Sequence, residues 1–283
     1  MVKTLLFLIA MSTAAQAQLA NPSLFRVSGP SGDSFLLGTI HVGVDLSEFP
    51  VDVRNLIQKS RVVLPELDMT DEELSLYQTD PFRALAKHNP FFRANLDVQT
   101  KARLMQLGFP DYIVTTLGDS DCGVLAPLVE IRAGKIPMDL QVLQIAHANH
   151  LPVQALDTNQ LREQARAGQD QAQGACSLKQ IFSYYTDAQI LASLEASDSA
   201  EINSYRRGDP IPNDELNSPL ATIRNRAWIP AVETEVKLGR AFIAVGQVHL
   251  FGSQGLIQLL VQKGYTVTQM NGSRARAAGE AVH

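Results

Sequence analysis

The sequence predicts one α/β domain with a mixed, mostly parallel central sheet, flanking helices, a helix-rich middle insertion and an N-terminal β-hairpin. Short β-prone runs alternate with amphipathic segments, which is the pattern of α/β folds. Two of these runs end in the same Gly-x-x-His motif, one near each end of the chain. The long stretch between the two motifs has mainly helical periodicity, so it is expected to be an insertion.

The expected elements follow from periodicity, turn residues and caps. Residues 24–28 and 34–39 form a hairpin around 29–33, a loop that looks too long for a tight turn. Further strands are expected at 61–67, 151–156, 240–245 and 265–269, and helices at 50–60, 137–149, 178–194, 213–238 and 253–263, with helical pieces between 71 and 123.

The first 17 residues have the features of a secretory signal peptide. Lys3 precedes an apolar run from Leu5 to Met11, and Ala15-Gln16-Ala17 is a small-x-small cleavage signal. The run is far shorter than the roughly 20 residues that span a bilayer. We expect export to the periplasm with cleavage after Ala17, although a short buried helix is the alternative. Residues 18–270 then form one domain, and 271–283, rich in Gly, Ala and Arg, a disordered tail.

Composition limits the partners. The chain has 283 residues with 24 Lys and Arg against 29 Asp and Glu, a net charge of −5. That length can bury a sizeable core. An acidic balance gives no reason to expect nucleic acid, whose phosphates need a basic face. No second segment is apolar enough to span a membrane, so the expected partner is a peptide or small-molecule substrate.

The two cysteines, Cys122 and Cys176, are expected to form a disulfide in an oxidising compartment. The bridge would close a loop of about 55 residues and stabilise the fold by roughly 4 kcal/mol in the chain-entropy model. Two unpaired buried thiols are the alternative.

The repeated motif carries the candidate chemistry. Gly38-Thr-Ile-His41 and Gly246-Gln-Val-His249 each follow a strand and precede a helix and a second strand. Two such units suggest that the first and the last pair within one sheet. Ligands of open α/β sheets bind beyond the carboxyl ends of the strands, where His41, Glu66, Asp157 and His249 all fall. Gly38 and Gly246 would let the backbone leave the strand in a conformation that a β-carbon resists.

Two imidazoles and one or two carboxylates are a plausible ligand set for Mn²⁺, Co²⁺, Zn²⁺ or Fe²⁺. Such an ion would lower the pKa of bound water and polarise a carbonyl group, which gives hydrolysis. Glu66 is then either a ligand or the general base. In a metal-free version, Glu66 or a histidine activates water directly. Each histidine alone could also be an ordinary packing residue.

The same segments resemble a known family. Leu36 to Val42 and Ala244 to Leu250 look like the N- and C-terminal signatures of the TraB/GumN family, to which the Tiki proteases are similar. Leu64-Pro-Glu-Leu-Asp68 corresponds to its acidic strand end and places the family's glutamate on Glu66. The segments 204–209 and 223–228 resemble two more family segments, of which the second supplies Arg224. The sequence departs from the family at Asp157, where a glutamate is expected.

The resemblance implies metal-dependent proteolysis as in the Tiki branch, with His41, His249, Glu66 and Asp157 as metal ligands. Glu66 and Arg224 are the expected catalytic residues, with Arg224 orienting the substrate by clamping a carboxylate or stabilising an oxyanion. The leading hypothesis is therefore a periplasmic metal-dependent hydrolase. The alternatives are a non-catalytic binding protein for haem, a metal ion or a saccharide, linked to envelope polysaccharide export, and a degenerate member kept for protein interaction.

Overall fold

The computed structural model describes residue 19 and residues 22–41, 43–87 and 95–270. The expected signal peptide, residues 1–17, and the expected tail, residues 271–283, lie outside the described residues. Within the described part, no helix is both long enough and apolar enough to cross a membrane.

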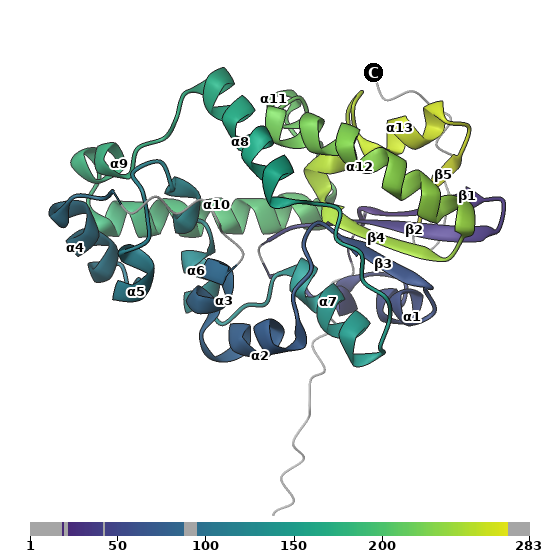
Figure 1. The fold of residues 1–283 in the computed structure, drawn as a ribbon, viewed down its shortest axis with the longest axis horizontal. Coiled ribbons are helices and arrows are strands. Elements are labelled where there is room, and N and C mark those ends of the chain that lie inside the picture. Colours follow the sequence, from purple (N-terminus) through teal and green to yellow (C-terminus); the bar gives the residue numbers. More distant parts are fainter. Residues whose placement is uncertain (1–18, 20–21, 42, 88–94, 271–283) are drawn as a thin grey trace, which may run out of the picture.

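A five-stranded mixed sheet in the order β3-β4-β2-β1-β5 forms the centre of one half of the molecule (Figure 1). The parallel pairs are β2 with β4 and β3 with β4, and β1 is antiparallel to both β2 and β5. The sheet is therefore mixed as expected, but only half of its strand pairs are parallel. The strands are β1 (Leu24–Gly29), β2 (Gly32–Thr39), β3 (Val62–Pro65), β4 (Ala241–Gly246) and β5 (Thr266–Gln269).

The N-terminal hairpin is tighter than the sequence suggested. Gly29 pairs with Gly32, so only Pro30 and Ser31 remain in the turn. The expected five-residue loop was wrong because glycines were read as loop residues, whereas here they extend both strands. Gly32 has a φ of 120°, a conformation that a residue with a β-carbon rarely adopts.

The two faces of the sheet are covered by different helices. The side chains of β2 and β4 alternate, so Leu36 and Ile243 pack with α12 and α13 while Leu37 and Phe242 pack with α1 and α7. Figure 1 shows α12 and α13 above the sheet and α1 and α7 below it. The helices of these layers are α1 (Val53–Gln58), α7 (Met138–Ala148), α12 (Pro219–Leu238) and α13 (Leu256–Gln262).

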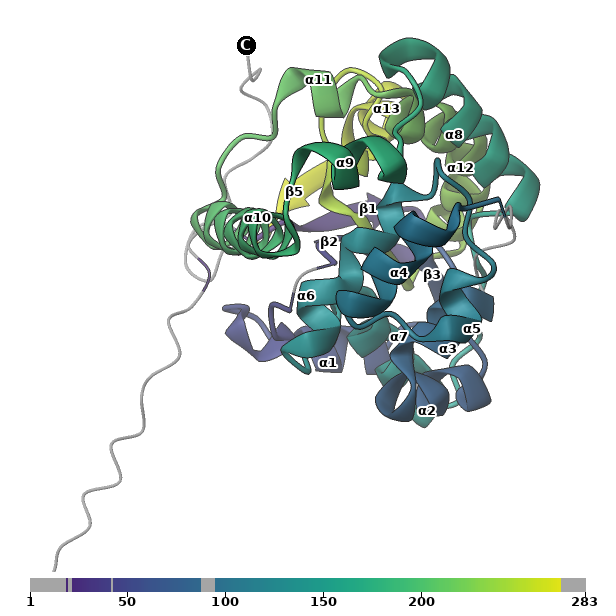
Figure 2. The same cartoon turned by 90° about the vertical axis from the view of Figure 1, so that its left-hand side faces the viewer.

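The middle of the chain forms a helical lobe beside the sheet, with a separate hydrophobic core (Figures 1 and 2). The long helix α10 (Asp187–Arg207) runs from this lobe to the sheet, where Tyr205 donates a hydrogen bond to the carbonyl oxygen of Gly38. The other helices of the middle of the chain are α2 (Asp71–Thr79), α3 (Pro81–Lys87), α4 (Val98–Gln106), α5 (Asp111–Val114), α6 (Pro127–Arg132), α8 (Asn159–Gln173) and α9 (Leu178–Tyr184), with the short 3₁₀ helix η2 (Cys122–Leu125). Beside the sheet lie α11 (Asn213–Leu216), next to α12, and the 3₁₀ helices η1 (Leu46–Glu48) and η3 (Gln247–His249).

The expected disulfide is confirmed. Cys122 in η2 is bonded to Cys176 in the segment between α8 and α9, across 54 positions of sequence. The bridge therefore ties η2 to the segment that leads into α9. The same region is held by Arg166 of α8, whose guanidinium forms an ion pair with the buried Asp121 at 3.0 Å.

Caps explain where two expected helices break. The stretch expected as one helix at 178–194 is α9 followed by α10, because Thr186 caps the second helix in a reciprocal pair with Gln189. The stretch expected at 213–238 is α11 followed by α12, since Ser218 accepts a hydrogen bond from the backbone N–H of Ala221 and Pro219 is the first helical residue.

One expected strand is only an edge segment. Residues 151–156 run along β3 and share one bridge, Val153 with Val63, but do not form a regular strand. The backbone N–H of Asp157 still donates to the carbonyl oxygen of Glu66, at 2.9 Å. This segment therefore brings Asp157 to the end of β3, where the candidate site lies.

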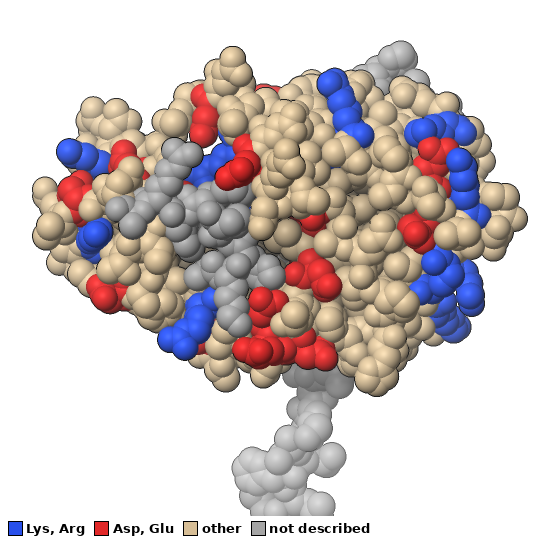
Figure 3. Space-filling model, viewed as in Figure 1, with Lys and Arg blue, Asp and Glu red and all other residues tan. Residues whose placement is uncertain are grey.

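Acidic side chains gather below the centre of the face shown in Figure 3. The first turn of α2 contains Asp71, Glu72 and Glu73, as expected for the positive end of a helix dipole. His147 of α7 contacts two carboxylates here, Asp71 at 2.8 Å and Asp68 at 3.4 Å. His147 thus joins α7 to the start of α2, which is a structural role.

Candidate functional site

The guanidinium of Arg224 lies at the centre of the candidate site. It reaches from α12 towards the ends of β3 and β4, where its Nη2 donates to Glu66 Oε2 and Asp157 Oδ2, both at 2.5 Å. Its Nε donates to Asp157 Oδ1 at 3.2 Å, so the pairing with Asp157 is bidentate. The Arg224 side chain is 14% exposed, Glu66 16% and Asp157 0%, which makes these ion pairs nearly desolvated.

Trp228, one turn further along α12, forms the floor beneath this cation. The guanidinium carbon of Arg224 lies 4.5 Å from the centroid of the indole ring, which is cation–π geometry. The indole N–H donates to Asp157 Oδ1 at 2.9 Å. The ring of His249 packs on the same indole with centroids 4.5 Å apart. Trp228 therefore holds Arg224, Asp157 and His249 against one surface.

Asn225 fixes the orientation of His249. Its amide Nδ2 donates to two carbonyl oxygens, those of His249 at 3.1 Å and Gln254 at 2.8 Å. The amide oxygen must therefore face Nδ1 of His249, 2.8 Å away, and Nδ1 must carry the proton. Nε2 of His249 is then an acceptor, and Nη1 of Arg224 donates to it at 3.1 Å.

Electrostatics keep this cluster charged in a defined pattern. Burial alone would raise the pKa of Glu66, but the charge of Arg224, aided by both histidines, holds it well below its usual range. Burial lowers the pKa of His249 to about 4, so its ring is neutral near pH 7. Burial also raises the pKa of Asp157, against the stabilising bonds from Arg224. The half-buried Arg162 of α8 adds a second guanidinium on this side.

The motif glycines are needed for space. A β-carbon on Gly246 would lie 3.2 Å from Glu66 Oε1, an oxygen that accepts the backbone N–H of Gly246 at 2.6 Å. A β-carbon on Gly38 would lie within 2.8 Å of the Leu250 side chain. Neither glycine has a positive φ. The expectation that they permit an unusual backbone conformation was therefore wrong, and close packing is the reason for them.

His41 lies at the end of β2, where its ring is anchored by an acidic residue of α7. Nδ1 of His41 and Asp139 Oδ2 are 2.8 Å apart, with the imidazole 71% exposed and Asp139 23% exposed. His41 is close enough to Glu66 and His249 for its charge to lower the pKa of both. The structure thus places both motif histidines on one edge of the sheet. His249 is buried there and His41 is exposed.

The two histidines share one feature of metal-binding histidines, because in each an oxygen acceptor engages Nδ1 and directs Nε2 elsewhere. The arrangement around them does not fit a divalent ion. The cation between Glu66 and His249, whose Oε1 and Nε2 are 3.6 Å apart, is the guanidinium of Arg224. Among the described residues, no three His, Cys, Asp or Glu side chains are grouped so that they could hold a metal ion.

The structure brings together four of the expected site residues, Glu66, Asp157, Arg224 and His249, with His41 at the exposed rim. Asp139, Asn225 and Trp228 were not predicted from the sequence. All three lie on helices that were expected, but no motif marks Asp139. For Asn225 and Trp228, the signal was their place in the family-like segment 223–228.

Comparison with known proteins places the chain in a family. The family model described as TraB/PrgY/gumN family matches residues 123–269, which is about half of the chain. The chain belongs to this family, as its motifs suggested. The matched range contains Asp157, Arg224 and His249, while His41 and Glu66 precede it. No curated protein and no solved structure matches the chain.

Proposed function

We propose that this protein is an exported hydrolase that acts at the edge formed by the ends of β2, β3 and β4. The observation that carries the proposal is the His41–Asp139 pair, a solvent-exposed imidazole whose Nδ1 is held 2.8 Å from a carboxylate. An acidic partner on Nδ1 fixes the tautomer and stabilises the imidazolium that forms when Nε2 accepts a proton, the logic of His–Asp pairs in hydrolases. His41 is the general base of this proposal.

The buried cluster supplies the other half of the chemistry. Water gives a proton to Nε2 of His41, and its oxygen attacks the carbonyl carbon of the substrate. Four of the five N–H groups of Arg224 are used within the cluster, and the remaining one, on Nη1, would donate to the developing oxyanion. The tetrahedral intermediate then collapses: its carbonyl bond reforms, the bond between the carbon and the leaving group breaks, and His41 gives its proton to the leaving group. Glu66, as a tightly paired carboxylate, orients Arg224.

The disulfide supports the exported setting of the proposal, since such bonds form and persist in oxidising compartments. The periplasm is the compartment that we propose. The proposal does not include the metal-dependent form of the hydrolase. It would require Arg224 to leave Glu66 and His249, so no step is assigned to a metal ion here.

The test is a turnover screen of the purified mature protein on p-nitrophenyl esters and internally quenched peptides. His41→Ala is the variant and His150→Asn the control, because His150 is exposed and has a φ of 52°, which asparagine tolerates. We expect the parent and the control to hydrolyse one substrate class and His41→Ala to lose at least 100-fold in kcat. Equal turnover by parent and His41→Ala would overturn the proposal.

A binding protein without catalysis is the other candidate. It predicts ligand retention without product, so the same preparations are to be incubated with haem and followed at the Soret band. His249 is only 4% exposed on its side chain and is held by Asn225 and Arg224, so it cannot reach haem iron as it stands. A stoichiometric haem complex without hydrolysis of any substrate would favour the binding function.

A further inference from the structure

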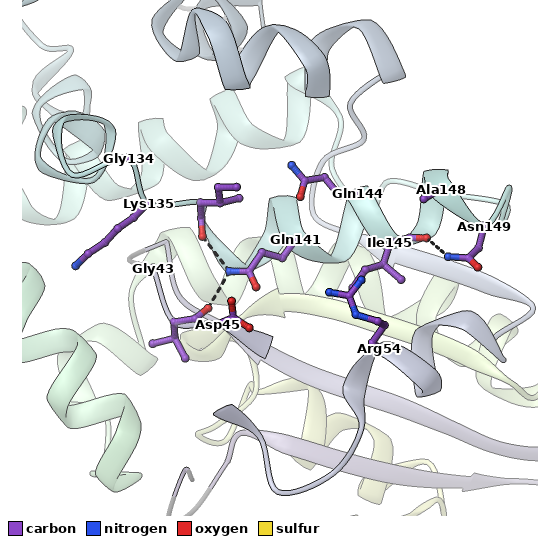
Figure 4. Close-up of a pocket in the computed structure, with 12 residues that line it drawn as sticks. Gly43, Asp45, Arg54, Gly134, Lys135, Gln141, Gln144, Ile145, Ala148 and Asn149 are labelled. Atoms are coloured by element: carbon purple, nitrogen blue, oxygen red, sulfur yellow. Dashed lines mark hydrogen bonds between the residues drawn. The ribbon is translucent and has the colours of Figure 1, made fainter. Parts of the chain in front are cut away.

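A groove of about 480 Å³ lies along α7 (Figure 4). Its walls are residues 43–45, residues 134–136, Arg54 of α1 and one face of α7 from Gln141 to Asn149. We call it the α7 groove. Residue 43 is two positions after His41, and residue 136 is three positions before Asp139. One end of the groove therefore adjoins the proposed general base.

The walls of the groove are fixed by the protein itself. The amide Nε2 of Gln141 donates to the carbonyl oxygens of Val44 and Ile136, at 2.9 and 3.0 Å, and its Oε1 accepts the backbone N–H of Leu46 at 3.1 Å. Gln141 thus joins both loops to α7. A β-carbon on Gly43 would lie only 2.7 Å from Lys135 Cβ, so the two loops are in close contact. The groove is therefore preformed. The amide of Gln141 is used to hold its walls, so a ligand has to be bound by the other lining side chains.

The charge of the groove favours an anion. Arg54 points from α1 across the groove towards α7 in Figure 4, whereas Lys135 extends along the rim away from the other lining side chains. Within the described part of the chain, Arg54 makes no hydrogen bond or ion pair. Asp45 is the one carboxylate among the groove's described residues, and its Oδ1 accepts the backbone N–H of Ser47 at 2.7 Å. The charge of Arg54 helps to lower the pKa of Asp45, after the hydrogen bonds from Ser47, but no hydrogen bond joins the two side chains, so the donors of the guanidinium are suited to bind a second carboxylate.

The shape of the groove favours an extended peptide. From Gln141 to Asn149, α7 rises roughly 12 Å at 1.5 Å per residue, which is the length of three to four residues of extended chain. None of the groove's described lining residues is aromatic, so it offers no ring on which a sugar could stack. Its polar side chains include Gln144 and Asn149, whose amides suit hydrogen bonds to a peptide backbone.

We propose that the α7 groove binds a peptide segment of the substrate and that Arg54 determines specificity by pairing with a carboxylate a few residues from the bond at His41. This inference rests on the proposed hydrolase for the position of that bond. The binding of the peptide itself is independent of turnover. The carboxylate is an acidic side chain or the C-terminus of the peptide.

Fluorescence polarisation with labelled hexapeptides tests this directly. One peptide has a central Glu and an amidated C-terminus, the second has Gln in place of Glu, and the third has Gln with a free C-terminal carboxylate. The variant is Arg54→Gln. The control is Lys59→Gln, which removes one exposed positive charge from the end of the same helix but lies outside the groove.

We expect Arg54→Gln to raise the Kd of the Glu peptide or of the free-acid peptide about tenfold, the loss of one charge-assisted contact. The Gln amide peptide and the Lys59→Gln control should be unchanged. Arg54→Glu should reverse the preference, from the Glu peptide to a Lys peptide. Equal effects of Arg54→Gln on charged and neutral peptides, tighter binding of an oligouronate than of any peptide, or no peptide binding would each overturn the inference.

The outcomes separate this inference from the proposed function. Carboxylate-dependent binding without cleavage of any peptide or ester supports the groove and counts against the hydrolase. Turnover that depends on His41 but has no preference for an acidic peptide supports the hydrolase and refutes the groove. Circular dichroism of Arg54→Gln checks the fold, and because Arg54 is exposed, no change is expected.

Discussion

Replacing Arg224 by methionine tests whether this side chain is the cation that holds the site together. The change keeps much of the aliphatic length but removes every hydrogen bond of the guanidinium. Asp157, with a fully buried side chain, and Glu66, only 16% exposed, then lose their ion pairs, and the half-buried Arg162 is the guanidinium that remains near them. Removing one member of a buried ion pair typically costs 3–5 kcal/mol, because the remaining charge stays desolvated.

We therefore expect Arg224→Met to lower the free energy of unfolding by about 4 kcal/mol at pH 7. In a domain of this size that corresponds to a fall in Tm of roughly 8–16 °C. The loss should shrink near pH 4, because protonation of the unpaired carboxylates removes the buried charges. Urea unfolding at both pH values measures it.

The control for this measurement is Arg226→Met, two positions along the same helix. Arg226 is exposed and, among the described residues, donates to the side chain of Gln254 alone, at 3.0 Å, so its replacement should change stability by no more than about 0.5 kcal/mol. A difference of less than 1 kcal/mol between Arg224→Met and Arg226→Met would refute the view that Arg224 is the central cation.

Three further results are expected. The pKa of His249 is about 4 in the folded protein and 6.5 in the unfolded chain, so the unfolded chain binds more protons between these pH values. The free energy of unfolding should therefore fall by about 3 kcal/mol as the pH drops from 6.5 to 4. His249→Asn should flatten this part of a urea-unfolding series, and an unchanged slope would contradict the prediction. Calorimetric titration with Zn²⁺ or Mn²⁺ should show tighter binding to Arg224→Ala than to the parent, because the guanidinium lies between Glu66 and His249. One tightly bound metal ion per chain in the chelator-treated parent would refute the view that Arg224 occupies the place of a metal ion. Changing both Cys122 and Cys176 to serine should cost roughly 4 kcal/mol through the 54-position loop, measured by the urea midpoint, and a loss below 1 kcal/mol would mean that the bridge adds little.

Strand-end logic predicted much of the candidate site. Glu66, Asp157 and His249 follow β-prone runs, and the carboxyl ends of parallel strands meet at one edge, so their convergence could be expected from the sequence alone. The role of Arg224 could not be predicted in the same way. The sequence suggested a cation for the substrate, but the geometry of two carboxylates from separate segments decides that most of its donors are used inside the protein.

The hydrogen-bond partners of the two histidines could not be predicted from the sequence, because tertiary packing brings them together. Asp139 is 98 positions from His41, and Asn225 is 24 from His249, so only helix packing decides that they meet. Asp139 lies in no motif, and the family-like segment around Asn225 does not say which residue it contacts. Their effect is large all the same, since they set which nitrogen of each ring is available.

In the fold, too, one helix could be predicted from the sequence and another could not. The helix α7 was expected because Met138, Val142 and Ile145 follow helical spacing, and all three are buried. The helix α8 was missed because its sequence is mainly polar and Ala165 is its one buried residue among those described, so its apolar face is short and narrow. It is held instead by close contact with α12, where Gly168 allows Ile223 and Pro219 to approach. The contact with α12 therefore adds to a local signal, the N-cap at Thr158, which accepts a hydrogen bond from the backbone N–H of Leu161.

The most direct test of the account is the turnover of Asp139→Asn on whichever substrate the parent hydrolyses. Asparagine keeps the shape of the side chain but cannot stabilise a protonated His41, whose Nδ1 lies 2.8 Å from the carboxylate. We expect kcat to fall by about 100-fold or more towards that of His41→Ala, with KM little changed. A kcat within twofold of the parent, in a protein where His41→Ala is inactive, would contradict it.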